Sequence, residues 1–442
     1  MDAGSTLTNE RTRGAATDTD SFTSSSPRPK LAFVYNPRSF GAMALADAAN
    51  GLCDLVWVVD TSHPEVESMT RLLRRFGPCV DVAGLSIDEA ASKIAEHAPQ
   101  GILSLADDSL LWTAEVAIRL GLTFLSPATA ARLTDKHVQR QALREGGLSV
   151  PRSWLVRHGE EETAWSTIAS EASFPAVLKP RLGAGSRDTI PITTPDELRA
   201  LGALPRSFDD HPRDFVLEEF IPDATYPAGG EGFAGYVSVE SFVSDGHVTH
   251  LAINGRMPPA PPFRETGFFI PSALDNEQER AVLEVASRAL TAMGVVVGCL
   301  HTEIKLTPTG PIVIEVNGRI GGGVPQLLAS ANGVRMLSLA MRLALGEEVV
   351  CDEMPPCNRL AYLFYVQAPE ELRTITAVEG LNELQKVAGV DEIILNRGPG
   401  QNVDWREGNL GYVFSVAGTV ADHVELRHVY GLVASLVRIS GD

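Results

Sequence analysis

The chain has 442 residues, more than one hydrophobic core usually serves, so about two to four packed subdomains are expected. Its formal net charge of -19 argues against a general nucleic-acid-binding protein, because such proteins need a basic surface to displace counterions. Five cysteines without a Cys-x-x-Cys pair favour reduced thiols over disulfides or a zinc site. No apolar run reaches the roughly 20 residues of a membrane helix, and the N-terminus lacks the apolar segment of a signal peptide, so we expect a soluble, cytoplasmic protein.

The N-terminal part combines a polar tail with a compact alternating pattern. Residues 1–29 are rich in Ser, Thr, Asp and Arg and have almost nothing to bury, so we expect them to be disordered. From Lys30 onward, short apolar runs alternate with helical patterns, which predicts a parallel α/β domain over residues 30–130. The predicted strands are Leu31–Tyr35, Leu55–Val59 and Gly101–Leu105, and the predicted helices lie near 65–76 and 86–97. Asn36 and Pro37 follow the first strand where a dinucleotide-binding domain would have a Gly-x-Gly-x-x-Gly motif. A supporting or substrate-shaping role is therefore expected for this domain rather than dinucleotide binding.

A glycine-rich loop joins two predicted strands in the middle of the chain. The strand at 174–180 carries Lys179 near its end and leads into the loop at 181–188, and a second strand covers 189–192. Backbone N–H groups in such a loop can converge on one point, which is what a polyphosphate requires. An ordinary hairpin with no ligand is the alternative interpretation of the same pattern.

The strongest local pattern is a predicted β-hairpin at Leu300–Arg319. With the turn centred on Thr309, Glu303 lies directly opposite Glu315, because the numbers of two paired residues in a hairpin add up to twice the number at the turn centre. Asn317 follows on the same face, since side chains alternate with period two.

Facing carboxylates destabilise a sheet unless something neutralises them, and a divalent cation does so. Carboxylate and amide oxygens favour Mg²⁺ or Mn²⁺. Ile314 and Val316 are predicted to point the other way, into the core, and Arg319 is close enough in sequence to reach the same oxygens. The alternatives are a solvated acidic face, or a register slipped by one residue.

Taken together, the order and spacing of these motifs resemble the ATP-grasp superfamily. The matching residues are Asp135-Lys136, Val177–Lys179, Gly183–Ser186, Leu217–Phe220, Glu303 and Ile314–Arg319. Within the superfamily, His301–Leu306 and Arg264–Ser272 are similar to bacterial L-amino acid ligases of the alanine-anticapsin ligase type. The resemblance covers about residues 30–440.

The resemblance implies an α/β ATP-grasp fold, with α+β subdomains. The expected divisions are a pre-ATP-grasp domain at 30–130, an ATP-grasp domain at 131–350 with its lid at about 151–220, and a β-rich subdomain at 351–442. It also implies an ATP-dependent ligase that joins an amino acid or similar acid to an amine of an amino acid or peptide. The intermediate would be an acyl phosphate, the products ADP and phosphate, and the metal Mg²⁺. Members of the family are often dimers.

The same resemblance implies a nucleotide site. Its residues would be Lys136, Lys179, Gly183, Gly185, Ser186, Glu218, Glu219, Phe220 and Glu240. Glu218 would accept a hydrogen bond from the adenine amino group, and the backbone at Phe220 would read the ring. Glu240 would face the ribose or the metal cleft, or it is an exposed strand residue.

For the chemistry, the resemblance implies that Glu303, Glu315 and Asn317 are Mg²⁺ ligands. Arg319 would stabilise the acyl phosphate and the tetrahedral intermediate. Glu265 would receive a substrate ammonium and Arg256 would lie near the transferring phosphate, although both can instead be surface ion pairs.

Two departures from the family pattern concern the substrate pocket. Phe268 stands where the alanine-anticapsin type has histidine, and the run Gly321–Gly323 offers no bulky side chain. We therefore expect a roomy pocket for the acid, suited to a nonproteinogenic or aromatic substrate.

The rest of the chain predicts architecture. Thr134 or Asp135 can cap a helix running to about Glu145. A capping box at Asp275 precedes an amphipathic helix that ends at Gly294. One helix is expected from Pro325 to Leu345. Alternating segments at 360–366 and 411–416 predict C-terminal strands, with no recognisable chemistry among them. The two strand-edge histidines, His247 and His250, are too sparse for a metal site and are expected to be solvated.

Three other functions stay open. An ATP-grasp carboxylase or purine-pathway ligase would share the nucleotide site, although the segment Arg264–Ser272 favours amino acids. A noncatalytic ATP-binding module would not need Glu303, Glu315, Asn317 and Arg319 together. A ligase for a ribosomal or carrier-protein tail is the third.

Overall fold

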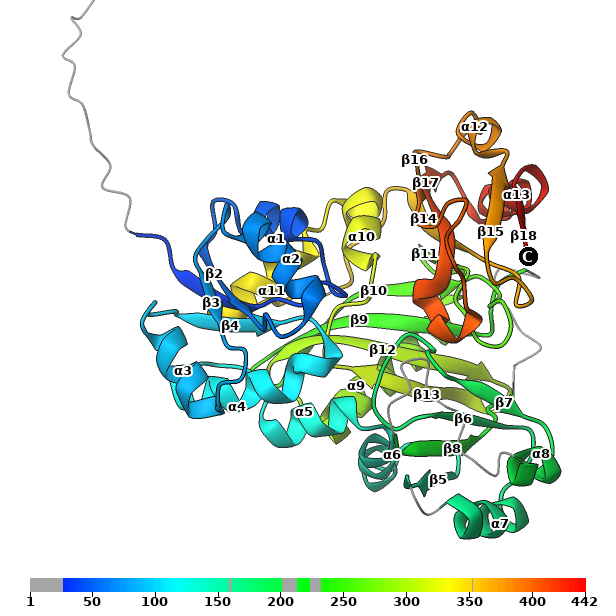
Figure 1. The fold of residues 1–442 in the computed structure, drawn as a ribbon, viewed down its shortest axis with the longest axis horizontal. Coiled ribbons are helices and arrows are strands. Elements are labelled where there is room, and N and C mark those ends of the chain that lie inside the picture. Colours follow the sequence, from blue (N-terminus) through cyan, green and yellow to red (C-terminus); the bar gives the residue numbers. More distant parts are fainter. Residues whose placement is uncertain (1–26, 159–160, 201–212, 223–231, 352) are drawn as a thin grey trace, which may run out of the picture.

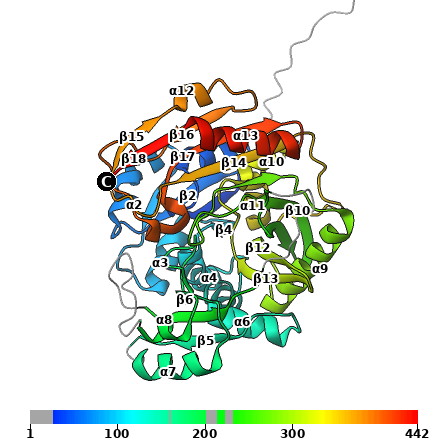
Figure 2. The same ribbon diagram turned by 90° about the vertical axis from the view of Figure 1, so that its right-hand side faces the viewer.

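The computed structural model describes residues 27–158, 161–200, 213–222, 232–351 and 353–442. Figures 1 and 2 show an N-terminal α/β domain, a central sheet that continues into the C-terminal strands, and a small lid sheet. The mixed α/β fold expected from the sequence is confirmed. Among the helices in these ranges, none is both long enough and apolar enough to span a membrane. The expected disordered tail lies almost wholly outside the described residues.

The N-terminal domain is a parallel four-stranded sheet with helices on both faces. Its strand order is β3-β2-β1-β4, as expected for an alternating α/β pattern. The elements are β1 (Lys30–Val34), α1 (Ala42–Ala49), β2 (Asp54–Val59), α2 (Pro64–Leu73), β3 (Cys79–Asp81), α3 (Ile87–Ala95), β4 (Gly101–Ser104), the 3-10 helix η1 (Asp107–Ser109) and α4 (Leu110–Leu120). Leu31 and Phe33 pack toward α1 and α2, and Ala32 and Val34 pack toward α3 and α4. This alternation is what a strand buried on both faces requires.

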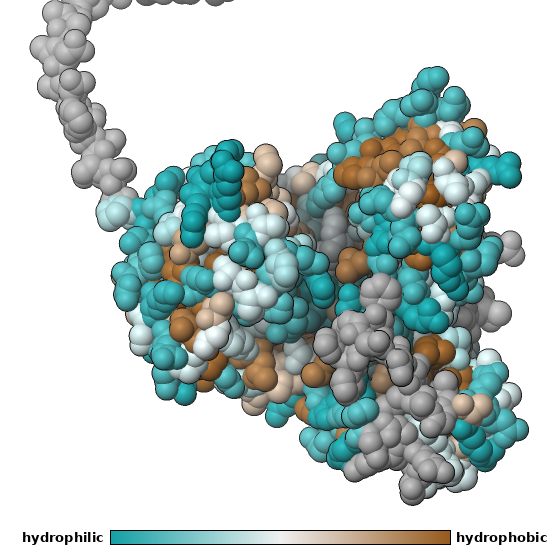
Figure 3. Space-filling view, viewed as in Figure 1, coloured by the Kyte–Doolittle hydropathy of each residue, from teal (hydrophilic) through white to brown (hydrophobic). Residues whose placement is uncertain are grey.

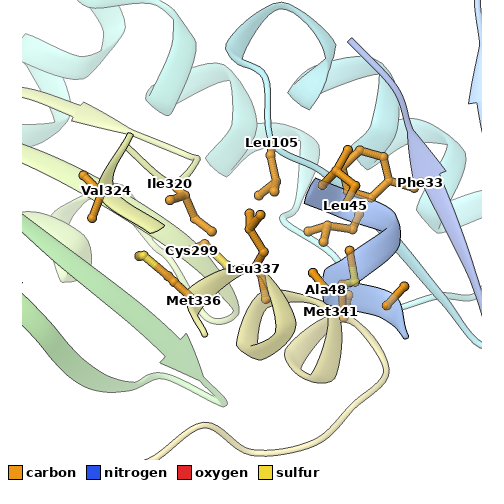
Figure 4. Packing of buried hydrophobic residues seen from close by; sticks show 14 of the residues in the cluster. Phe33, Leu45, Ala48, Leu105, Cys299, Ile320, Val324, Met336, Leu337 and Met341 are labelled. Atoms are coloured by element: carbon orange, nitrogen blue, oxygen red, sulfur yellow. The ribbon is translucent and has the colours of Figure 1, made fainter. Parts of the chain in front are cut away.

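The N-terminal domain is fixed to the rest of the molecule through α1. Its Leu45 and Ala48 pack with Leu337 and Met341 of α11 (Met336–Ala344) in one core cluster, shown in Figure 4. Ser338 Oγ also donates to the Ala48 carbonyl at 2.9 Å. Side chains of α11 thus hold this domain against the central sheet.

Two shorter helices replace the single one expected from Pro325 to Leu345. They are α10 (Val324–Asn332) and α11, and the break falls at Gly333, whose φ of +78° ends α10. The expectation was wrong because a left-handed glycine terminates a helix even where the apolar pattern continues.

The central antiparallel sheet has eight strands in the order β13-β12-β9-β10-β11-β14-β17-β16. Its strands are β9 (Tyr236–Ser244), β10 (His247–Arg256), β11 (Gly267–Ile270), β12 (Gly298–Thr307), β13 (Gly310–Asn317), β14 (Leu360–Gln367), β16 (Glu392–Leu395) and β17 (Tyr412–Val420). Helix α9 (Asn276–Met293) covers one face, capped by Asp275 through the predicted capping box. The C-terminal strands extend this sheet through the pairing of β11 with β14, so it runs past residue 350 without interruption.

Smaller elements complete the two ends of the molecule. The C-terminal end has β15 (Ile375–Glu379), α12 (Leu381–Leu384), the 3-10 helix η2 (Trp405–Gly411), α13 (His423–Leu436) and β18 (Arg438–Gly441). The lid is an antiparallel sheet in the order β5-β8-β6-β7, formed by β5 (Ser153–Val156), β6 (Ala176–Pro180), β7 (Ile190–Ile192) and β8 (Phe215–Glu219). Helices α7 (Glu161–Glu171) and α8 (Pro195–Ala200) belong to the lid, and α5 (Pro127–Thr134) and α6 (Lys136–Glu145) lead into it.

Surface and edge features differ from the sequence-based expectations in one respect. His247 is exposed as expected, but His250 is largely buried and lies 2.8 Å from both Ser241 Oγ and Ser287 Oγ. The expectation of a solvated residue is therefore wrong for His250, because α9 covers its strand.

Figure 3 shows a mainly hydrophilic surface with a concentration of apolar residues near the edge strand β16, where Ile394 is 50% exposed.

Candidate functional site

The β12–β13 hairpin places the two predicted carboxylates opposite each other. Glu303 pairs with Glu315, and His301 pairs with Asn317. The turn is tighter than predicted, because Thr307 pairs with Gly310. With that turn alone, Glu303 would face Ile314, the residue before Glu315.

A β-bulge at Ile314 corrects the register. Ile304 pairs with Val313 while Glu303 pairs with Glu315, so Ile314 is the extra residue on β13. Val313 and Val316 are fully buried in the core, whereas Ile314 is only partly buried. The core position predicted for Ile314 is wrong, and the one predicted for Val316 is right.

Three buried strands place polar side chains at alternate positions on the face of this carboxylate pair. They are Ser238 and Glu240 on β9, Asn254 and Arg256 on β10, and His301 and Glu303 on β12. Glu240 lies opposite His301, and Ser238 lies opposite Glu303. Polar groups this deep in a sheet need partners, and most of these find them in one another.

Glu240 is the centre of this polar layer. It is fully buried, so the alternative of an exposed strand residue is wrong. Its Oε1 accepts from Asn254 at 2.8 Å and bonds His301 Nδ1, and its Oε2 accepts from the Gly321 backbone N–H at 3.3 Å. These contacts orient the His301 ring and the turn after β13. Contact of Glu240 with a nucleotide remains a prediction.

His301 lies between two carboxylates. Burial alone would lower the pKa of His301, but Glu240 and then Glu303 raise it to about 9, so the ring is protonated at neutral pH. Burial likewise opposes ionisation of Glu303, yet the hydrogen bond from His301 and the charges of Arg256 and Arg319 lower the pKa of Glu303. Glu303 is therefore ionised, as a metal ligand must be.

The donor set at the hairpin fits a hard cation. Glu303 and Glu315 offer carboxylate oxygens, and Asn317 Nδ2 donates to the His301 carbonyl at 3.4 Å, which leaves its Oδ1 for a ligand. All-oxygen ligands suit Mg²⁺. Within the described ranges, no three His, Cys, Asp or Glu side chains form a group that could hold a metal ion.

Both predicted lysines lie beside this hairpin. Lys136 is the first residue of α6, capped by Asp135, and its Nζ is 3.0 Å from Glu315 Oε1 and donates to the Gly183 carbonyl. Lys179 is buried at 2.8 Å from Glu218. Burial lowers the pKa of Lys179, an effect that Glu218 opposes.

Glu218 is held in the lid by two cations. Besides Lys179, Arg140 of α6 donates to Glu218 Oε2 at 3.0 Å. Burial alone would raise the pKa of Glu218, but Arg140 and Lys179 lower it to about 2. The adjacent Glu219 accepts from the Ser173 N–H at 3.3 Å. The Phe220 N–H donates to the Pro175 carbonyl at 3.0 Å, so it is already engaged.

The glycine loop is the turn of the β6–β7 hairpin. Gly183 and Gly185 have φ of +121° and +71°, and Ser186 has φ of +56°. Such left-handed backbone is typical of loops whose N–H groups converge on an anion. The hairpin interpretation and the phosphate-loop interpretation therefore describe the same segment, and only a ligand distinguishes them.

The N-terminal domain holds Arg319 through a residue that the sequence did not suggest. Arg319 Nε donates to Asp107 Oδ2 at 2.7 Å. Burial disfavours the charge of Arg319, but Asp107, and more weakly Glu303 and Glu315, raise its pKa. Arg319 therefore lies within the electrostatic range of both hairpin carboxylates.

Glu265 and Arg256 form a partly buried ion pair rather than a surface one. The Arg256 guanidinium also donates to Ser238 Oγ at 2.8 Å and lies 5.2 Å from the centre of the Phe268 ring. The interpretation of both residues as surface ion pairs is wrong for this reason.

The glycine run after Arg319 is less open than expected. A Cβ on Gly321 would lie 2.6 Å from His301 Nδ1, and one on Gly323 would lie 2.5 Å from Leu363 Cδ2. Only at Gly322 would a Cβ meet nothing within 4 Å. Gly321 and Gly323 therefore permit close packing rather than enlarge a pocket.

Sequence reasoning missed several residues of this site. They are His301 as a side chain, Ser238, Asn254, Arg140, Asp107 and Asn409. Polar residues two apart on otherwise buried strands are a signal that could have indicated the first three. No local pattern marks the others, whose partners are distant in sequence.

Comparison with known proteins agrees with this geometry. Residues 172–326 match the family model of the ATP-grasp domain, a region that includes the glycine loop and the whole β12–β13 hairpin. Over these residues the chain is similar to the ATP-grasp domain. The crystal structure of an L-amino acid ligase from Bacillus licheniformis has a TM-score of 0.72 over 95% of this chain and 100% of that one, at 20% identity, and shares its fold.

Two curated relatives are named as a synthase and a ligase. Carnosine synthase 1 of Gallus gallus is 31% identical over 283 residues, which are 60% of this chain and 29% of that protein. Alanine–anticapsin ligase of Bacillus subtilis (strain 168) is 29% identical over 222 residues, 47% of this chain and 46% of that one. The chain thus spans less than half the length of either relative.

Proposed function

We propose that this protein is an ATP-dependent ligase that joins the carboxyl group of an amino acid, or of a similar acid, to an amine. The observation that carries the proposal is the pairing of Glu303 with Glu315 beside Lys136 and the glycine loop. The similarity to carnosine synthase and alanine–anticapsin ligase supports amino-acid substrates over bicarbonate or a nucleotide.

In this proposal the hairpin and the lid hold Mg²⁺ and ATP together. Glu303, Glu315 and Asn317 would hold Mg²⁺, which when bound neutralises phosphate charge that otherwise repels an attacking carboxylate. Lys136 joins the hairpin to the loop, since its Nζ contacts both Glu315 and the Gly183 carbonyl.

The reaction then has two displacements. A carboxylate oxygen of the acid forms a bond to the γ-phosphorus of ATP as the bond to ADP breaks, giving an acyl phosphate. The amine nitrogen next forms the C–N bond, loses a proton, and phosphate leaves. Arg319 would stabilise the developing oxyanion, a contribution of about 3–4 kcal/mol for a well-placed donor. Glu265, already paired with Arg256, would receive the substrate ammonium.

The acid pocket is proposed to accept an apolar or aromatic side chain. Phe268 and Tyr365 lie with ring centres 5.8 Å apart, and Tyr365 and Tyr412 lie 4.8 Å apart. Gly322 is exposed, and its neighbour Gly323 lies against Phe268, so a side chain at position 322 would narrow the approach to these rings. A Gly322→Val variant should lose activity with bulky acids more than with small ones. Strict preference of the wild type for alanine or glycine would contradict this pocket.

The decisive experiment is a screen for ADP release over pairs of amino acids with Mg-ATP, followed by mass spectrometry of the product. ADP release that requires both an acid and an amine, with an amide product, is expected. ADP release with bicarbonate alone would indicate a carboxylase. Binding of Mg-ATP without release of ADP for any pair would indicate a noncatalytic module.

A further inference from the structure

A C-terminal residue contacts two parts of the candidate site at once. The Asn409 backbone N–H donates to the Gly185 carbonyl of the glycine loop at 2.8 Å. Its side-chain Oδ1 accepts from the Glu265 backbone N–H at 2.9 Å. We propose that Asn409 is a positioning residue that couples nucleotide binding at the glycine loop to the placement of Glu265. This inference rests on the proposed function, since it assumes a nucleotide at the loop and a substrate amine at Glu265.

The contact between η2 and the glycine loop is close and depends on glycine. Gly408 has φ of +64° and ψ of -135°, a conformation essentially confined to glycine. A Cβ on Gly408 would lie 2.2 Å from the Gly185 carbonyl oxygen and 2.7 Å from the Arg187 nitrogen. The Asp188 N–H also donates to the Arg406 carbonyl at 3.2 Å. The two backbones are thus packed without space between them.

On the substrate side, the backbone of Glu265 is held at both ends by side chains of the C-terminal part. Asn409 binds its N–H, and Gln367 Nε2 donates to its carbonyl at 2.7 Å. With the backbone fixed, the carboxylate is directed to Arg256. Loss of the Asn409 amide would release one of the two backbone anchors while the ion pair stayed available.

The segment that carries Asn409 is itself anchored. Arg397 pairs with Glu407, and its Nη1 donates to both Glu407 Oε1 at 3.1 Å and the Asn402 carbonyl at 2.6 Å. A displacement of the loop can therefore pass through η2 to Glu265 rather than be absorbed within η2. The C-terminal part, for which the sequence predicted no chemistry, thus has a role in assembling the site.

Coupling of this kind has a defined thermodynamic consequence. If nucleotide binding favours the loop position that Asn409 holds, it also favours the Glu265 position, and the effect is reciprocal. One neutral hydrogen bond corresponds to about a fivefold change in an equilibrium constant. The coupling through Asn409 should therefore be of about that size.

Hydrogen–deuterium exchange with Mg-ADP tests the coupling without any need for turnover. In the wild-type chain, Mg-ADP should slow exchange about fivefold or more both in peptides covering 181–189 and in peptides covering 264–268. In Asn409→Ala, Mg-ADP should still protect 181–189 but no longer protect 264–268. Asn409→Asp keeps the acceptor oxygen and should behave as the wild type. Asn382→Ala removes an exposed asparagine of α12 in the same C-terminal part and serves as the matched control.

The kinetic readout separates positioning from simple loss of structure. Asn409→Ala should raise KM for the amine substrate about fivefold, while KM for ATP at low amine changes less than twofold. Protection of 264–268 by Mg-ADP in Asn409→Ala, or its absence in the wild type, would refute the coupling. An equal defect in Asn409→Asp would also refute it. Failure of the wild type to bind Mg-ADP would instead refute the proposed nucleotide site, and the inference with it.

Discussion

Glu303 and Glu315 lie directly opposite each other on β12 and β13, although the two strands change register immediately beside them. The tight turn shifts the pairing by one residue, and the bulge at Ile314 shifts it back. The carboxylates therefore face each other although the turn is not centred where the sequence predicted it. Facing carboxylates destabilise a sheet, and here Lys136 contacts one while His301 lies 3.4 Å from the other. These two side chains offset part of the repulsion between the carboxylates, so the pair is tolerated in the sheet.

The first prediction concerns Glu315. Glu315→Gln keeps the volume of the side chain but removes one of the two proposed anionic Mg²⁺ ligands. We expect the variant to fold, with Mg-dependent ADP release reduced at least a hundredfold, because the cation then lacks charge compensation. A coupled assay for ADP and a thermal melt measure the two quantities.

Glu67→Gln, on the exposed part of α2, is the matched control and should leave both unchanged. ADP release by Glu315→Gln within tenfold of the wild type would rule out Glu315 as a ligand.

The second prediction concerns Asp107. Asp107→Asn removes the anion that fixes Arg319 from the N-terminal domain. We expect kcat to fall about tenfold to a hundredfold with KM for ATP nearly unchanged, because the proposal has Arg319 act on the acyl group and not on the nucleotide. Steady-state kinetics with ATP and amino acid varied in turn give both constants.

Asp88 pairs with Arg119 on the surface, so Asp88→Asn controls for loss of an aspartate–arginine pair and should cost little. A matching change in kcat for both variants would show that the effect of Asp107 is not specific.

The sequence was sufficient for the parts of the site that depend on local periodicity. Alternation along residues 300–319 predicted the hairpin and the facing carboxylates, and Asp135, one of the two caps that the sequence offered, is the observed cap of α6. The exact turn was not predictable, because a bulge depends on how Val313 and Val316 fill the core beneath the sheet.

Contacts between distant segments could not be predicted in the same way. Asp107 and Arg319 are 212 residues apart, and Asn409 and Glu265 are 144 apart. Their proximity depends on how α1 packs on α11 and on the continuation of the central sheet into β14. Packing of this kind leaves no periodic signal in a single sequence.

The third prediction concerns pH. Burial lowers the pKa of His250 from 6.5 to about 4. Between these values the unfolded chain binds a proton that the folded chain does not, so stability falls as the pH falls from about 6.5 to about 4. In His250→Gln, the loss of unfolding free energy over this pH range should be smaller by about 1–3 kcal/mol. The variant also loses one of the contacts to Ser241 and Ser287, but this loss is the same at every pH.

Urea unfolding of wild type and variant at pH 7 and pH 4.5 measures how much the free energy of unfolding of each protein changes with pH. His247→Gln replaces an exposed histidine of the same strand and should follow the wild-type pH dependence. If His250→Gln showed the same pH dependence of the unfolding free energy as the wild type, the assignment of a buried, neutral imidazole would be contradicted.

The fourth prediction compares two glycines with positive φ. Gly408 and Gly400 have φ of +64° and +84°, so alanine strains the backbone at both positions, by about 1–3 kcal/mol at Gly408, whose ψ is -135°. A Cβ at Gly400 would meet nothing within 4 Å, whereas one at Gly408 would collide with the Gly185 carbonyl. Gly408→Ala should therefore displace the glycine loop and raise KM for ATP at least fivefold, and Gly400→Ala should not. Thermal melts establish whether the two variants are equally stable. If Gly408→Ala and Gly400→Ala have the same KM for ATP, the η2 contact does not position the loop, because backbone strain alone then explains the effect of both substitutions.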